Sequence, residues 1–119
     1  IGAGNLGHAL ANHAVFSRRG FNLVAIFDTD KEKIGTKINN TEVLPFDSIS
    51  DFLDKNDVKI AILTLPKQHT QKAADIVTAH GVKGLWNFSH MDLEVTDDIV
   101  VENVHLSDSL MTLSYLLNK

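Results

Sequence analysis

The chain has 119 residues, 44% of them hydrophobic and 22% charged, with a formal net charge of −4 at pH 7. This length fits about one domain with a buried core, and no apolar stretch approaches the ~20 residues that a membrane-spanning helix needs. The negative charge argues against a domain that grips nucleic-acid phosphates by itself, and the lack of cysteine excludes disulfides and cysteine-ligated metals and fits a cytoplasmic protein.

A glycine-rich motif opens the chain, with Gly2, Gly4 and Gly7 spaced as G-x-G-x-x-G. The first glycine allows a tight turn after a strand, the second lets the backbone approach a pyrophosphate, and the third lets a helix pack closely. The N-terminus of that helix would face the phosphates. A strand-to-helix turn without a ligand is the alternative. Only Ile1 precedes the motif, where a Rossmann strand needs several apolar residues, so we expect the chain to be cropped from a longer protein.

A helix is predicted after the motif, because Leu6, Leu10 and Ala14 recur at the spacing of one helical face. Two arginines followed by Gly20 are typical of a helix C-terminus. We therefore expect this first helix to end near Arg18.

The apolar residues 23–27 predict a strand that is covered on both faces, because they do not alternate with polar ones. The strand ends in Asp28, which lies 21 positions after Gly7. A carboxylate there can accept both hydroxyls of an adenosine ribose and would repel the 2′-phosphate of NADP, so NAD is favoured. The nearby Lys31 and Lys33 are interpreted as solvated loop charges.

The rest of the chain alternates between strand and helix patterns. Residues up to Asn40 are expected to be irregular after the turn, and Ser48 or Asp47 is predicted to cap a helix. The remaining elements are a short extended piece at Val43–Leu44, a helix with Ile49, Phe52 and Leu53 on one face, a buried strand over Val58–Leu65, a helix over Lys67–His80 stopped by Gly81, strands at Gly84–Phe88 and Ile99–Val101, and a helix over Leu106–Leu117. This order predicts an α/β fold, a Rossmann-like open parallel sheet with helices on both faces.

The last predicted helix is apolar around much of its circumference. Its apolar residues are Leu106, Leu110, Met111, Leu113, Tyr115, Leu116 and Leu117. One face could cover the sheet of its own domain, and the rest would stay exposed. Full burial within the same domain is one interpretation, and a partner chain that covers the helix is the one we favour.

Polar strand ends indicate where a ligand would bind, and no pattern indicates catalysis. Residues 64–66 and 87–89 follow two later strands, at the carboxyl edge where open α/β sheets bind ligands. The six histidines show no metal-ligand spacing, and no nucleophile elbow occurs. The residues after Phe88 are too few for a second, substrate-binding domain. A binding module therefore fits better than an enzyme.

With these residues placed, the chain resembles Rex, a family of redox-sensing transcriptional repressors of Gram-positive and related bacteria. The resemblance is carried by GAGNLGHALANHAVF, FNLVAIFDTD, KEKIGTKI, VKIAILTLP, AADIV, AHGVKGLWNF and VENVHLSDSLMTLSYLLNK. It implies that residues 1–105 form a Rossmann domain that binds NADH or NAD. It also implies that residues 106–119 form a dimerisation helix, swapped between the subunits of a homodimer, and that a winged-helix DNA-binding domain precedes Ile1. NADH binding would then release operator DNA.

The resemblance also implies which residues contact the cofactor. These are Gly2, Ala3, Gly4, Asn5, Leu6, Gly7, His13, Asp28, Thr64, Leu65, Pro66, Asn87 and Phe88. The glycine segment would hold the pyrophosphate and Asp28 the adenosine ribose, while residues 64–66 and 87–88 would border the nicotinamide.

Three positions depart from the family pattern. A tyrosine commonly stands where this chain has His13, an aspartate where it has His105, and Ala-Pro where it has Ser89-His90. The imidazole of His13 is smaller than a tyrosine ring, so we expect weaker burial of nicotinamide. Because imidazole can also protonate, we expect the preference for NADH to rise as the pH falls. A His13 side chain that points to solvent or to the partner helix is the alternative.

Two other function classes stay open. The chain could be the cofactor domain of an NAD-dependent oxidoreductase, or a coenzyme A- or nucleotide-binding domain. The apolar final helix counts against the first class. Asp28 counts against the second, because coenzyme A has no free ribose 2′,3′-diol.

Overall fold

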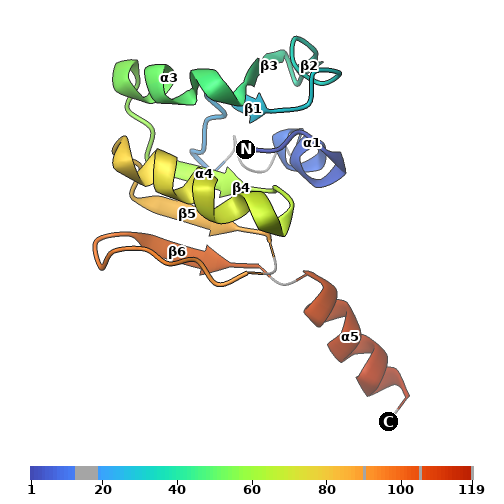
Figure 1. Cartoon of the computed structure of the whole chain (residues 1–119). Coiled ribbons are helices and arrows are strands. Elements are labelled where there is room, and N and C mark those ends of the chain that lie inside the picture. Colours follow the sequence, from blue (N-terminus) through green and yellow to red (C-terminus); the bar gives the residue numbers. More distant parts are fainter. Residues whose placement is uncertain (13–18, 90, 105, 119) are drawn as a thin grey trace.

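A computed structural model of the chain describes residues 1–12, 19–89, 91–104 and 106–118 (Figure 1). In chain order the elements are α1 (Asn5–Ala11), β1 (Ile26–Asp28), β2 (Lys37–Ile38), β3 (Thr41–Pro45), the 3₁₀ turn η1 (Phe46–Ser48), α3 (Ile49–Lys55), β4 (Ile60–Leu63), α4 (Lys67–Ala79), β5 (Gly84–Asn87), β6 (Val100–Asn103) and α5 (Leu106–Leu117). Within the described ranges, no helix is both long enough and apolar enough to cross a membrane.

Two three-stranded sheets, β1-β3-β2 and β4-β5-β6, are joined by the first two residues of the chain. The Gly2 amide donates to the Phe27 carbonyl at 2.8 Å, and the Thr64 amide donates to the Ile1 carbonyl at 3.0 Å. Ile1 and Gly2 therefore lie between β1 and β4. On one side of this junction, β1 pairs in parallel with β3. On the other side, β4 pairs in parallel with β5, and β5 with β6. The predicted Rossmann-like open parallel sheet is confirmed.

The edge beyond β3 differs from the prediction. Residues 37–45 form an antiparallel hairpin of β2 and β3, where the sequence predicted an irregular stretch up to Asn40. Asn39 and Asn40 form its tip with φ values of 50° and 64°. Asparagine tolerates this left-handed conformation better than most residues, so two adjacent asparagines can make a two-residue hairpin turn. The turn contains no glycine, the residue whose presence most clearly indicates such a hairpin in a sequence.

The prediction that residues 23–27 form a strand buried on both faces holds only for Ile26 and Phe27, which are 6% and 5% exposed. The strand β1 begins only at Ile26, and Leu23 and Val24 are 43% and 56% exposed. On the side of β4, β1 is paired through Gly2, which bonds to Phe27. Residues 21–25 extend past that bond and lack strand structure.

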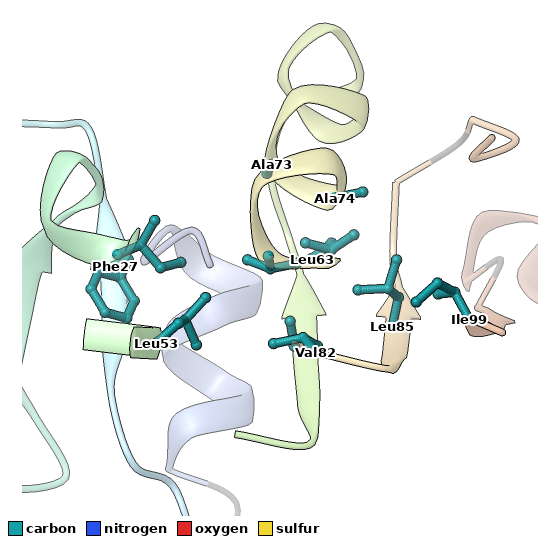
Figure 2. Close-up of a cluster of buried hydrophobic side chains, with 11 residues drawn as sticks. Phe27, Leu53, Leu63, Ala73, Ala74, Val82, Leu85 and Ile99 are labelled. Atoms are coloured by element: carbon teal, nitrogen blue, oxygen red, sulfur yellow. The ribbon is translucent and has the colours of Figure 1, made fainter. Parts of the chain in front are cut away.

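The core has two clusters, on opposite faces of the sheet. The larger cluster contains Phe27, Leu53, Leu63 and Leu85 (Figure 2). It lies beneath α3 and α4, which pack against each other, while α4 also packs against β4. The smaller cluster contains Ile26 and is joined by a residue of α1. Because neighbouring residues of a strand point to opposite faces, helices cover both faces, as predicted.

The helices follow the sequence patterns with differences at their ends. Helix α4 ends at Ala79, and Gly81 follows in the left-handed region with a φ of 100°, as expected for a C-terminal stop. Ser48 precedes α3 at the predicted position, but its hydroxyl donates to the Pro45 carbonyl at 2.7 Å and does not cap the helix amides. Helix α1 ends at Ala11, and residues 13–18, where its predicted continuation falls, lie outside the described residues.

Helix α5 has the predicted bounds and projects away from the rest of the domain (Figure 1). All of its side chains that the structure describes are exposed, including Leu113 and Leu117, which are 54% and 76% exposed. The expectation that one face could cover the sheet of its own domain does not hold for these side chains.

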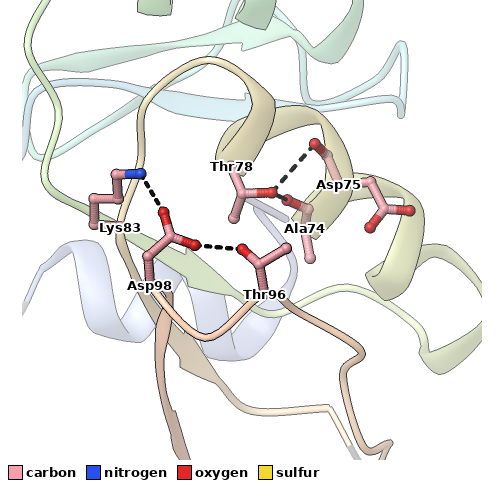
Figure 3. A network of polar contacts seen from close by, with 6 residues as sticks. All are labelled: Ala74, Asp75, Thr78, Lys83, Thr96 and Asp98. Carbon is pink, nitrogen blue, oxygen red and sulfur yellow. Dashed lines mark hydrogen bonds and ion pairs between the residues drawn. The ribbon is translucent and has the colours of Figure 1, made fainter.

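A polar network ties the loop before β6 to the residue before β5 (Figure 3). The Lys83 Nζ donates to the Asp98 carboxylate at 2.6 Å, and the Thr96 hydroxyl donates to the other oxygen of that carboxylate. These two hydrogen bonds lower the pKa of Asp98 to about 2. The ionised form of Asp98 is therefore favoured in the folded chain.

This network predicts a pH-dependent contribution to stability. Because the pKa of Asp98 is lowered on folding, its contribution is fully present above the pKa of about 4 that an aspartate has in an unfolded chain, and it is lost as the pH falls towards 2. Urea unfolding of the parent chain and of Asp98→Asn should therefore differ at pH 6 and converge as the pH falls below 4. The exposed neighbour Asp97, changed to Asn, is the control. A gap between parent and Asp98→Asn that is the same at pH 6 and pH 2.5 would contradict the assignment.

Candidate functional site

A cavity of about 510 Å³ opens at the carboxyl edge of the strands, between the glycine segment, β1, β4 and α4. Its described lining residues are Ile1, Gly2, Gly4, Asp28, Thr29, Asp30, Lys33, Phe46, Thr64, Leu65, Pro66, His69, Lys72 and Ala73. The volume falls within the range of ~300–1,000 Å³ that small-molecule sites occupy. Six of the predicted site residues, from three separate segments of the chain, meet in this one cavity.

The three glycines of the motif have different surroundings. Gly2 has a φ of 101°, and a Cβ there would lie 2.7 Å from the Thr64 hydroxyl oxygen. A Cβ at Gly7 would lie 1.9 Å from the Gly2 carbonyl oxygen, so α1 can pack against the turn only without a side chain. Gly4 lines the cavity, and a Cβ there would meet no atom within 4 Å. The protein itself therefore does not require glycine at position 4, whereas a ligand lying against the backbone would.

Asp28 is held in place by backbone amides of both neighbouring loops. One carboxylate oxygen accepts from the Ala3 amide at 2.7 Å, and the other accepts from the Asp30 amide at 2.9 Å. A carboxylate can accept about four hydrogen bonds, so each oxygen keeps the capacity for one more. The half-buried Asp28 carboxylate is thus oriented by the glycine segment and can accept two hydroxyl groups of a ligand.

Two lysines and a histidine that were not predicted from the sequence as site residues also line the cavity. Lys33, interpreted from the sequence as a solvated charge, is half-buried there, and His69 and Lys72 reach it from the first two turns of α4. Asp28 and Asp30 lie at the end of β1 and in the loop after it. The cavity therefore contains groups of both charges. The position of α4 directly after the Thr64–Pro66 exit was the signal in the sequence that could have indicated His69 and Lys72.

The other predicted site residues are four from the start of the chain, His13, and the pair Asn87 and Phe88. Ala3 is buried, and Leu6 and Gly7 lie half-buried in the first turn of α1, while Asn5 begins that helix. None of these four is among the described lining residues. His13 lies outside the described residues, as do His90 and His105. The expected effect of His13 on nicotinamide therefore stays a prediction.

Asn87 and Phe88 also lie outside the described cavity lining. Asn87 is completely buried, and its side-chain amide is hydrogen-bonded within the protein at both the oxygen and the nitrogen. Phe88 packs edge-on against Trp86, with ring centroids 4.7 Å apart. The predicted contact of both residues with the cofactor stays a prediction.

The cavity fits a dinucleotide by two observations on its own residues. The backbone at Gly4 is open to a ligand, and the Asp28 carboxylate has free acceptor capacity. Among the described residues, no three His, Asp or Glu side chains are grouped so that they could hold a metal ion.

Comparison with known proteins gives a family match and a close relative. Residues 1–91 match the family described as the CoA binding domain. The redox-sensing transcriptional repressor Rex of Clostridium botulinum (strain Hall) is 52% identical over 119 residues, which are 100% of this chain and 57% of that protein. The chain thus spans a little over half the length of this curated relative.

The solved structures most relevant to the cavity are those of RSP, which is described as a Rex-family repressor. The structure of RSP in complex with β-NADH is 49% identical, has a TM-score of 0.94, and is matched over 99% of this chain and 57% of that chain. The structure of RSP in complex with β-NAD⁺ and operator DNA is also 49% identical, with a TM-score of 0.93 over 99% of this chain and 54% of that chain. The chain therefore belongs to the family of the CoA binding domain and, within it, to the Rossmann-like domains of Rex redox-sensing repressors.

Proposed function

We propose that this domain binds NADH and NAD⁺ and is the redox-sensing regulatory domain of a Rex-type transcriptional repressor. The observation that carries the proposal is the cavity in which the glycine segment and the oriented Asp28 carboxylate meet. Two structures of a Rex-family repressor at 49% identity are described as complexes with β-NADH and with β-NAD⁺ and operator DNA, which supports the same ligand class. The relatives are named as repressors, which supports a regulatory role without catalysis.

In the proposed site, each segment has a different part in holding the cofactor. The backbone of Gly2 to Gly7 and the amides of the first α1 turn hold the pyrophosphate, and Asp28 accepts from the adenosine ribose. When bound, the cofactor supplies the redox state that is sensed. The protein contributes binding and orientation, and residues 64–66 lie towards the nicotinamide.

A coenzyme A ligand is the second candidate, because the matching family is described as a CoA binding domain. Coenzyme A carries a phosphate on the 3′ oxygen of its ribose. That phosphate would lie near the carboxylates of Asp28 and Asp30, where like charges repel. We therefore expect a preference for dinucleotides with a free 2′,3′-diol.

Replacing Asp28 with alanine should weaken NADH binding by ~1–3 kcal/mol, the scale of a charge-assisted hydrogen bond to a buried or half-buried group. Titration calorimetry with NADH, NAD⁺, NADP⁺ and coenzyme A measures this. Asp28→Asn is the matched variant, because it keeps the size and one acceptor oxygen but loses the charge, so it should relax the discrimination against NADP⁺. An affinity for NADH that Asp28→Ala leaves unchanged would remove Asp28 from the site, and tighter binding of coenzyme A than of NADH would favour the second candidate.

The proposal extends to assembly and to DNA. The exposed apolar side chains of α5 support a homodimer in which α5 packs against the partner subunit. We propose that operator DNA is bound by a winged-helix domain elsewhere in the longer protein, consistent with the net charge of −4 on this chain. NADH binding would change the dimer so that it releases operator DNA. The protein would act in the cytoplasm, where NADH and DNA both occur.

A further inference from the structure

The peptide between Gly2 and Ala3, at the start of the glycine segment, is bonded by side chains at both of its polar ends. Its carbonyl oxygen, on Gly2, accepts from the Thr64 hydroxyl at 2.8 Å. Its amide, on Ala3, donates to the Asp28 carboxylate at 2.7 Å. The C=O and N–H groups of a trans peptide point in opposite directions. A side chain from the end of β1 and one that follows β4 therefore hold this single peptide from opposite sides.

These side-chain bonds matter because the backbone at Gly2 is permissive. Gly2 has a φ of 101°, and a glycine can adopt conformations of either sign of φ at little steric cost. The Gly2 amide is fixed separately, because it donates to the Phe27 carbonyl at 2.8 Å. Gly2 and Ala3 are both buried, so a rotated Gly2–Ala3 peptide would lose two hydrogen bonds that water cannot easily replace. The peptide orientation thus depends on the two side chains that bond to it.

Thr64 is placed for this role by its own backbone. Its amide donates to the Ile1 carbonyl at 3.0 Å. Its hydroxyl oxygen lies 2.8 Å from the carbonyl oxygens of both Ile1 and Gly2, so its one proton is shared between them. Thr64 also lines the cavity, but its hydroxyl proton is directed at the glycine segment. The hydroxyl therefore has only its acceptor lone pairs left for a ligand.

We infer that Thr64 is a positioning residue for the ligand phosphates, which acts through the Gly2–Ala3 peptide and not through contact with the nicotinamide. The orientation of this peptide sets the direction in which the chain continues to Gly4, whose backbone is open to the cavity. Thr64 and Asp28 hold the segment in one conformation before the ligand arrives, which lowers the ordering cost of binding. The part that concerns the phosphates rests on the proposed function, and the part that concerns the peptide does not.

Thr64→Val tests the inference, because valine has the shape of threonine and cannot donate a hydrogen bond. Thr64→Ser keeps the hydroxyl and is the conservative variant. Thr78→Val is the matched control, because the Thr78 hydroxyl donates to the Ala74 carbonyl at 2.8 Å within α4 and Thr78 is not among the described lining residues of the cavity. The longer protein is used throughout.

Two measurements are made on each variant. Calorimetry gives the affinities for NADH, NAD⁺ and ADP-ribose, which carries the same adenosine and pyrophosphate without the nicotinamide. NMR of protein labelled with ¹⁵N-alanine follows the Ala3 amide proton in the absence of ligand. The first measurement reports on the phosphates and the second on the peptide itself.

Without ligand, the Ala3 amide proton of the parent should resonate downfield, because it is hydrogen-bonded to a carboxylate. It should stay there in Thr64→Ser and Thr78→Val, and in Thr64→Val it should move upfield or broaden as the peptide rotates. Thr64→Val should weaken the binding of all three ligands by the same factor, about tenfold, whereas Thr64→Ser should stay within about threefold of the parent. Direct contact with the nicotinamide would instead weaken NADH and spare ADP-ribose.

Two outcomes overturn the inference. One is an Ala3 resonance in Thr64→Val that matches the parent. The other is Thr64→Val with parent affinity for ADP-ribose, whatever its affinity for NADH. Thr64→Ala, which also lacks the hydroxyl, must reproduce both effects of Thr64→Val, so the test does not depend on how well valine is tolerated. A parent that binds neither NADH nor ADP-ribose would refute the proposed function instead, and the Ala3 resonance would still decide the role of Thr64 at the peptide.

Discussion

Replacing Gly7 with alanine should destabilise the domain by about 3 kcal/mol or more, the upper end of the cost of forcing extra atoms into a packed site. The added Cβ would lie 1.9 Å from the Gly2 carbonyl oxygen and 3.1 Å from the Thr64 hydroxyl oxygen. Both contacts involve segments that join the two halves of the sheet, so α1 cannot move away without opening the turn. Urea unfolding followed by circular dichroism measures this loss.

Gly4→Ala is the matched variant within the same motif. A Cβ at Gly4 meets no atom within 4 Å, and its φ of −72° suits any residue, so the free energy of unfolding should change by less than ~1 kcal/mol. The Cβ would instead stand where the backbone faces the cavity. We expect NADH affinity to fall at least about tenfold, because the second glycine of such motifs allows the approach of the pyrophosphate.

The two variants together separate folding from binding. Gly7→Ala with parent stability would mean that α1 can shift at no cost, contrary to its close packing against Gly2. Gly4→Ala with parent affinity for NADH would mean that the ligand does not lie against this part of the backbone. Thermal shifts with and without NADH provide an independent measure of both quantities.

Replacing Leu113 and Leu117 together with glutamate should raise the dimer dissociation constant at least about 100-fold, or leave only monomers. These side chains are one turn apart on one face of α5, and 54% and 76% exposed in the single chain. A twofold interface contains each residue twice, so four carboxylates would have to be buried without partners. Sedimentation velocity over a range of concentrations measures the change.

Thr112→Glu is the control for this prediction, because residue 112 lies on a different side of α5 from residues 113 and 117. It adds the same kind of charge to the same helix and should leave the dimer intact. A double variant that sediments as the parent dimer would place the interface elsewhere on the domain. A parent chain that is monomeric at all concentrations would contradict the proposed role of α5.

The sequence alone was sufficient for the features that depend on local chemistry. The glycine spacing predicted the tight turn at the start of the chain, because a turn with a positive φ and a closely packed helix both favour residues without a Cβ. Helix α4 was predicted to within one residue at its end, and α5 at both ends. Their start and stop signals and their apolar spacing act over a few residues, so neighbours in space did not alter them.

Only the tertiary structure decided features that depend on partners far along the chain. On one side β1 is bonded through Gly2, from the start of the chain, and no pattern within residues 21–28 indicates that pairing. Lys33, His69 and Lys72 line the cavity because α4 and the loop after β1 meet there. The buried amide of Asn87 is satisfied by Ser89, Met91 and Asn103, partners that the sequence did not indicate, and its predicted contact with a ligand stays a prediction. A side chain's partners follow from which strand ends lie side by side, and that is settled only when the whole sheet has formed.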